Sequence, residues 1–267
     1  MSDEKSVVKA SLINLEMPES VDTAVKNLSA PPTESAGQFF KDVIDLVVGP
    51  FHAFVEKRRL SWQFGVDQFK TDLQKQLDQI PEEKRTVPNM QIAAQTVQDS
   101  LFCAESEELR KMFVNLLASS VNSDKVDSVH PSFSGIIRRM TSADANVLMR
   151  FKARNSFPVV NYRYVMEQGH SVFEENVMDP RASQEETKSI SRSLVVLQSF
   201  GLVRLEYERF LVAEGIYSEF DKHPCITAKE SYLAVAKARN PLVKDVDYQR
   251  GIAELTPLGK QFLEVCT

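Results

Sequence analysis

The chain has 267 residues, a formal net charge of −5, and a composition that is 43% hydrophobic and 26% charged. This is an ordinary globular composition, long enough for one large domain or two smaller ones. The acidic balance argues against a general polyanion binder, although it leaves room for a local basic face. Only three cysteines occur, Cys103, Cys225 and Cys266, which argues against a disulfide framework and fits reduced thiols in a cytoplasm.

The sequence offers no segment that would direct the chain into a membrane. Its first residues contain no basic stretch followed by an apolar core, so no signal peptide is expected. The longest uncharged apolar stretch, Leu46 to Val55, is about half the length that crosses a bilayer, and Gly49-Pro50 interrupts it. We therefore expect no transmembrane helix and a cytoplasmic location.

The first half of the chain is predicted to be helical. Residues 1–38 are weakly patterned and end in a linker-like stretch. Apolar residues then recur at three or four positions, which predicts a helix from about Pro50 to Ile80, stopped by Pro81. Further helices are expected at 90–102, at 107–121, from Pro131 onward, and from Thr141 or Ser142 to about Arg154.

The second half changes to a mixed pattern. β-Branched and aromatic residues at 159–166 and 172–178 predict a hairpin around Gly169, and Ser183–Glu186 is a capping-box sequence that starts a helix ending at Gly201. The remaining predictions are a strand at 202–207, a helix at 227–237, a short strand at 251–255 and a helix at 257–265.

The order of the last elements resembles a winged-helix module. A helix precedes a Gly-Leu-Val strand, and a distant strand then leads into Leu255–Leu263. The expected fold class is therefore α+β, with a weakly ordered segment at 1–38, a helical domain at 39–155 and a smaller winged-helix-like domain at 156–267.

The most specific pattern in the chain lies between Ser106 and Asp144. It combines E-E-L-R-x-x-F-x-x-L-L-A-S-S with H-P-S-F-x-x-I-I and S-x-x-D-A. In this order and spacing, the pattern resembles the Abi-alpha family of bacterial proteins, which are linked by name to phage abortive infection. The positions that carry the resemblance are Glu108, Arg110, Phe113, Leu116, His130, Pro131, Ser132 and Phe133. The resemblance implies a biological setting, phage defence, and no particular reaction.

Common catalytic patterns are missing from the sequence. It contains no glycine-rich phosphate loop, no H-E-x-x-H, no paired C-x-x-C and no G-x-S-x-G, and its four histidines are too dispersed for a metal site. His223-Pro224-Cys225 is interpreted as a loop turn. His130 is the best single candidate for proton transfer, but capping of the helix that begins at Pro131 is the preferred interpretation. We expect neither an enzyme nor a cofactor.

A basic strip raises the question of nucleic-acid binding. Six basic residues and Asp144 alone lie between Pro131 and Tyr164. The candidate phosphate contacts are Arg138, Arg139, Arg150, Lys152 and Arg154, together with Lys188 and Arg192 of the winged-helix-like part. Intramolecular pairing with the acidic N-terminal half is the preferred interpretation, because charge runs are usually solvated surface.

Three functions are therefore compared. We expect a cytoplasmic antiphage protein that binds a protein partner or a phage component. The first alternative is a DNA-binding regulator that uses the basic strip. The second is a membrane-perturbing effector whose aromatic segment from Phe39 to Phe69, with Lys57-Arg58-Arg59, is exposed only after activation.

Overall fold

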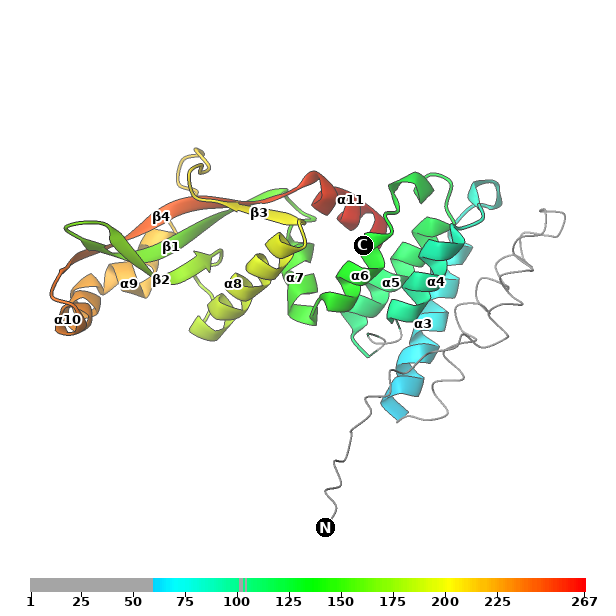
Figure 1. Ribbon diagram of the computed structural model, residues 1–267, viewed down its shortest axis with the longest axis horizontal. Coiled ribbons are helices and arrows are strands. Elements are labelled where there is room, and N and C mark those ends of the chain that lie inside the picture. Colours follow the sequence, from blue (N-terminus) through cyan, green and yellow to red (C-terminus); the bar gives the residue numbers. More distant parts are fainter. Residues whose placement is uncertain (1–59, 101–102, 104) are drawn as a thin grey trace, which may run out of the picture. The chain divides into compact units, whose positions relative to one another are not determined.

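The computed structural model describes residues 60–267 except 101, 102 and 104 (Figure 1). The helical region comprises α3 (Leu60–Asp78), α4 (Met90–Ser100), α5 (Glu107–Ser120), α6 (Ser132–Arg139) and α7 (Ser142–Arg150). Its centre is α5, which packs against the other four helices. The predicted buried face of α5, formed by Leu109, Met112, Phe113, Leu116 and Leu117, is confirmed.

Local capping explains where these helices begin. The Ser106 hydroxyl accepts a hydrogen bond from the Leu109 amide at the start of α5, as the sequence indicates. Thr141 and Asp144 form a reciprocal capping box at the start of α7. The prediction that α7 reaches Arg154 is wrong, because the helix ends at Arg150. Phe151 is buried there and its ring meets Phe157 edge-on at 5.0 Å, so the chain turns toward the sheet.

The long helix predicted from about Pro50 is described only from Leu60, and it ends before Pro81 as expected. The part of that prediction before residue 60, the weakly ordered segment at 1–38 and most of the aromatic segment lie outside the described residues. Within α3, the apolar stripe formed by Phe69, Leu73 and Leu77 is buried.

The sheet region is built on four antiparallel strands in the order β2-β1-β4-β3. The strands are β1 (Ser156–Met166), β2 (His170–Val177), β3 (Val203–Glu206) and β4 (Val243–Leu255). The hairpin of β1 and β2 confirms the prediction. Strand β1 also pairs with β4 along its whole length, whereas β3 pairs only with the last residues of β4.

The short strand predicted at 251–255 is wrong in length, because β4 begins eight residues earlier, at Val243. Charged residues interrupt the apolar pattern that would otherwise predict a strand in this half of β4. They are matched by partners in the folded chain: Asp245 lies 2.7 Å from Lys229, Asp247 lies 2.6 Å from Arg163, and Lys244 lies 3.0 Å from Glu167.

The helices of the sheet region are α8 (Gln184–Ser199), α9 (Pro224–Thr227) and α10 (Lys229–Arg239). A short 3₁₀ turn, η3 (Phe220–Lys222), lies just before α9. The capping box of Ser183 and Glu186 at α8 is confirmed. Helix α8 packs against α7, β2 and β3, while α9 and α10 pack against β4. The helix predicted at 227–237 is divided between α9 and α10, since Ala228 leaves helical geometry between them.

The last helix, α11 (Pro257–Cys266), connects the two regions. It follows β4 in sequence but packs against α5. The Ser119 side chain donates to the Val265 carbonyl at 2.9 Å, and Asn115 donates to the Cys266 carbonyl at 3.3 Å. The described residues belong to one compact unit, and the domain boundary expected near Ser156 stays a prediction. The mixed α+β class is correct.

Candidate functional site

The family-pattern residues build the centre of the helical region. Phe113, Leu116 and Phe133 are almost completely buried, and the Phe133 ring meets Phe262 of α11 edge-on at 5.1 Å. Arg110, also buried, lies 3.5 Å from the Asp72 carboxylate of α3. These apolar positions therefore hold α5, α6 and α11 together.

His130 lies at the start of α6. Its Nδ1 atom accepts a hydrogen bond from the Ser132 amide at 3.2 Å and lies 2.8 Å from the Ser132 hydroxyl. Pro131 immediately precedes the helix, and the imidazole is exposed to solvent. The imidazole therefore accepts from one amide of the first turn of α6, whereas the N-cap residue, Pro131, makes no side-chain cap. A further role of His130 is not required by the geometry.

Several residues of the basic strip have partners within the chain. Arg138 Nε lies 3.3 Å from the carboxylate of Asp99, whose side chain is almost fully buried. The Arg139 guanidinium lies over the Phe200 ring at 4.8 Å, and that of Arg154 lies over Phe157 at 4.2 Å. These contacts occupy three of the five residues proposed to meet phosphate between α6 and β1.

The other candidate phosphate contacts lie around α7 and α8. Arg150, Lys152, Lys188 and Arg192 are exposed, and no ion pair is found for them among the described residues. A cleft of about 340 Å³ lies between the two helices, but Asp179 and Glu186 line it beside Arg150 and Arg181. Carboxylates therefore lie beside the basic side chains at this cleft.

A thiol, an imidazole and a carboxylate meet beneath the sheet, which the sequence interpretation of His223-Pro224-Cys225 as a loop turn missed. His223 Nδ1 lies 3.0 Å from Cys225 Sγ, and its Nε2 lies 3.9 Å from the Glu174 carboxylate of β2. The Tyr162 ring of β1 stacks on the imidazole at 4.5 Å. Neither Glu174 nor Tyr162 is near His223 in sequence, so only the strand pairing could reveal this cluster.

The geometry of this cluster is typical of nucleophile activation, but its environment is not. Cys225 is fully buried, and burial, with a smaller effect of Glu174, raises the pKa of its thiol to about 12. Burial also lowers the pKa of His223, against the opposing effect of Glu174. The thiol is therefore protonated at neutral pH and closed to solvent in this structure.

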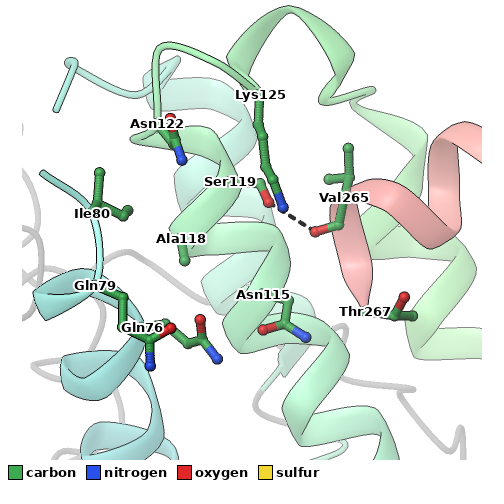
Figure 2. A pocket seen from close by; sticks show the side chains of 10 residues that line it. All are labelled: Gln76, Gln79, Ile80, Asn115, Ala118, Ser119, Asn122, Lys125, Val265 and Thr267. Carbon is green, nitrogen blue, oxygen red and sulfur yellow. Dashed lines mark hydrogen bonds between the residues drawn. The ribbon is translucent and has the colours of Figure 1, made fainter. Parts of the chain in front are cut away.

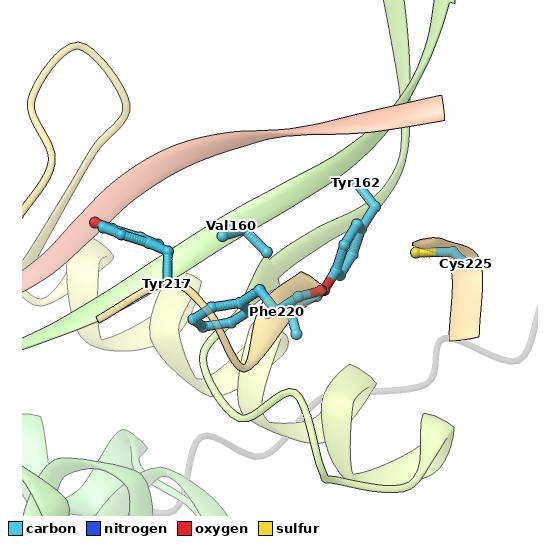
Figure 3. Close-up of a cluster of buried hydrophobic side chains, with 6 residues drawn as sticks. Val160, Tyr162, Tyr217, Phe220 and Cys225 are labelled. Carbon is cyan, nitrogen blue, oxygen red and sulfur yellow. The ribbon is translucent and has the colours of Figure 1, made fainter. Parts of the chain in front are cut away.

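The same cluster fastens η3 and α9 to the sheet. Tyr162 donates a hydrogen bond from its hydroxyl to the Phe220 carbonyl at 2.9 Å, and the two side chains are buried with Val160 and Cys225 (Figure 3). Tyr217, from the loop before η3, belongs to this buried group. The segment from Tyr217 to Cys225 is thus anchored by aromatic packing on β1.

The loop between β3 and η3, residues 207–219, carries a second cleft. We call it the loop cleft; its volume is about 470 Å³. Its lining combines apolar and charged side chains, including Phe210, Leu211, Val212, Ile216, Asp221 and Arg250. Phe210 and Val212 are exposed by 49% and 90% of their surfaces. The loop therefore presents exposed apolar side chains beside a cleft that charged side chains also line.

A third cleft, of about 310 Å³, lies where α3 and α5 meet the end of α11 (Figure 2). It is lined mainly by amides, from Gln76, Gln79, Asn115 and Asn122, together with Lys125. Lys125 Nζ lies 3.4 Å from the Glu264 carbonyl, and Ser119 and Asn115 bond to the next carbonyls of α11. These polar groups satisfy the end of α11, which gives them a structural role.

Two negative findings apply to the residues that the structure describes. Within 60–267, apart from 101, 102 and 104, no three His, Cys, Asp or Glu side chains are arranged to hold a metal ion. In the same part of the chain, none of the helices combines the length and the apolar character required of a bilayer span.

Comparisons with known proteins place the chain in a family. Residues 61–266 match the family described as abortive infection alpha. No match was found among curated proteins. One solved structure, an uncharacterized protein from the hydrocarbon-degrading marine bacterium Alcanivorax borkumensis SK2, is similar at 15% identity and a TM-score of 0.32. That similarity covers 54% of this chain and 94% of the other.

Proposed function

Because the chain belongs to the abortive infection alpha family, we propose that it is an antiphage defence protein that acts by binding another macromolecule and not by catalysis. The observation that carries the proposal is the loop cleft. Phe210 and Val212 are exposed beside it, while the rest of the loop is anchored to the sheet through Tyr217. Apolar side chains held outward on an ordered support are typical of protein interaction sites.

Catalysis is disfavoured by the state of the thiol–imidazole–carboxylate cluster. A thiol nucleophile requires a thiolate and access for its substrate. Burial opposes both the formation of a thiolate at Cys225 and the access of a substrate to it. The Tyr162 ring also covers one face of the His223 imidazole. Binding therefore accounts for the described surface with fewer rearrangements than a reaction at this cluster.

A second candidate is a winged-helix-like DNA-binding regulator. It is favoured by α8, which precedes β3 as a recognition helix precedes a wing, and by exposed Lys188 and Arg192 on that helix. Glu185 and Glu186 in its first turn weaken the positive field. Duplex binding that falls steeply with added salt would favour this candidate.

Phage challenge of cells with and without the gene tests the first proposal. We expect infected cells that express the protein to release fewer phage, with host survival and membrane potential followed in the same cultures. Phe113→Ala serves as a fold-deficient control, because this side chain is fully buried. Equal phage yield with the intact protein, the control and no protein would contradict the defence role. Loss of membrane potential before other changes would instead favour the membrane-perturbing alternative.

A further inference from the structure

The loop cleft combines a rigid frame with exposed apolar side chains. The Tyr217 hydroxyl donates to the Gly251 carbonyl of β4 at 2.7 Å and accepts from the Leu211 amide at 3.1 Å. Ser218 closes a turn by donating to the Gly215 carbonyl at 2.7 Å. Tyr217 therefore ties its end of the loop to β4, and the same hydroxyl holds Leu211, the neighbour of the exposed Val212.

Arg250 supplies the positive charge in the cleft, which Glu214 and Asp221 also line. Its guanidinium lies 5.4 Å from the centre of the Tyr217 ring and 5.8 Å from that of Phe210. No carboxylate of the described residues forms an ion pair with it. The other strand arginines of the described sheet have such partners: Arg163 pairs with Asp247, and Arg204 pairs with Glu206 and Glu254.

Arg250 is exposed and has five N–H donors, of which a hydrogen bond to the Tyr248 side chain occupies one. The remaining donors suit a carboxylate, which can accept two parallel hydrogen bonds. Glu214 and Asp221 also line the cleft and disfavour a polyanion such as a nucleic-acid backbone. Asp221 is held in place because it accepts a hydrogen bond from Tyr248 at 2.7 Å.

We propose that the loop cleft binds a segment of a partner protein in which an aromatic or branched apolar side chain lies next to a single carboxylate. The apolar side chain packs against Phe210 and Val212, and the carboxylate pairs with Arg250. This inference rests on the proposed function, because it names the kind of partner through which the protein would act.

Selection of a displayed library of random short peptides on the intact protein tests the proposal directly. We expect enriched peptides to carry Asp or Glu within two positions of an aromatic or branched apolar residue. Arg250→Gln should weaken their binding about ten- to a hundredfold, the value of a charge-assisted hydrogen-bonded pair. Val212→Ser should weaken peptide binding less than Arg250→Gln does. Added salt should weaken the binding of the same peptides to the unmodified protein.

Two matched variants control for charge and for surface apolarity. Arg239→Gln removes an exposed arginine at the end of α10, and Val235→Ser removes an exposed apolar side chain of the same helix. Both should bind the selected peptides as the unmodified protein does. Thermal melting of all four variants establishes that they are folded. No enrichment, enrichment of basic or uncharged peptides, or binding that survives Arg250→Gln would overturn the proposal.

Phage challenge with the same variants separates this inference from the broader function. The cleft is supported if the unmodified protein and Arg239→Gln protect the cells, while Arg250→Gln does not. Protection that persists in both Arg250→Gln and Val212→Ser overturns the cleft and leaves defence by binding intact. An unmodified protein that does not protect contradicts the proposed function, and peptide selection then decides the cleft alone.

Discussion

Helices α5 and α10 show how differently the two regions use their surfaces. Helix α5 buries ten of its 14 residues among α3, α4, α6, α7 and α11, whereas α10 buries only Ala236 among its 11 residues. The family pattern lies mostly on α5 and α6, so much of what it specifies is packing. Side chains available to a partner are more readily found on the sheet region, where the loop cleft lies.

The largest effect should follow from a cavity in α5. Phe113→Ala is expected to lower the free energy of unfolding by about 3–5 kcal/mol, through lost burial and the empty space left behind. Chemical denaturation measures this change. Val235→Ser on α10 should change the same quantity by less than about 0.5 kcal/mol. Similar losses in the two variants would remove the contrast between the helices.

Arg138 tests whether the basic strip serves the fold. Arg138→Ala leaves the buried Asp99 carboxylate without its cation and should cost about 1–3 kcal/mol of stability. Combined replacement of Arg138 and Arg139 should lower the melting temperature, while duplex DNA affinity stays unmeasurable at physiological salt before and after. Arg192→Ala should leave stability unchanged. Submicromolar, salt-sensitive DNA binding that the double substitution abolishes would instead favour the DNA-binding candidate.

Tyr217 tests the frame of the loop cleft. Tyr217→Phe keeps the ring but removes the hydroxyl shared by the Gly251 carbonyl and the Leu211 amide. We expect a loss of about 1–2 kcal/mol, because two backbone groups lose a partner in a partly buried site. Hydrogen exchange at the Leu211 amide should accelerate. Unchanged exchange there would show that the loop keeps its form without this anchor.

His223 should give the sheet region a small dependence on pH. Burial lowers its pKa in the folded state, so the unfolded chain binds a proton more readily. The contribution of neutral His223 to the free energy of unfolding is therefore present above about pH 6.5, the ordinary pKa of histidine. It is lost as the pH falls below that value toward the lowered pKa of the folded state. His223→Gln should flatten this part of the stability profile, whereas His170→Gln, at an exposed position, should not. Parallel profiles for all three proteins would exclude the effect.

Sequence patterns predicted the features that depend on neighbouring residues. The caps at Ser106 and Ser183, the buried face of α5 and the β1–β2 hairpin all follow from local spacing. The first half of β4 was missed because its charges find partners only after folding. Glu174 reaches His223 through strand pairing, and Arg250 reaches the 207–219 loop through β4, so neither site has a sequence pattern of its own.

The return of α11 to α5 has a consequence for synthesis on the ribosome. Ser119 and Asn115 are translated well before the carbonyls of Val265 and Cys266 that they bind. Phe133 is likewise translated well before Phe262, the ring that it contacts in the folded chain. The helical region emerges first, yet one side of α5 stays uncovered until α11 leaves the exit tunnel. Slow translation through the sheet region would therefore prolong the time for which Phe133 and this side of α5 lack their partners.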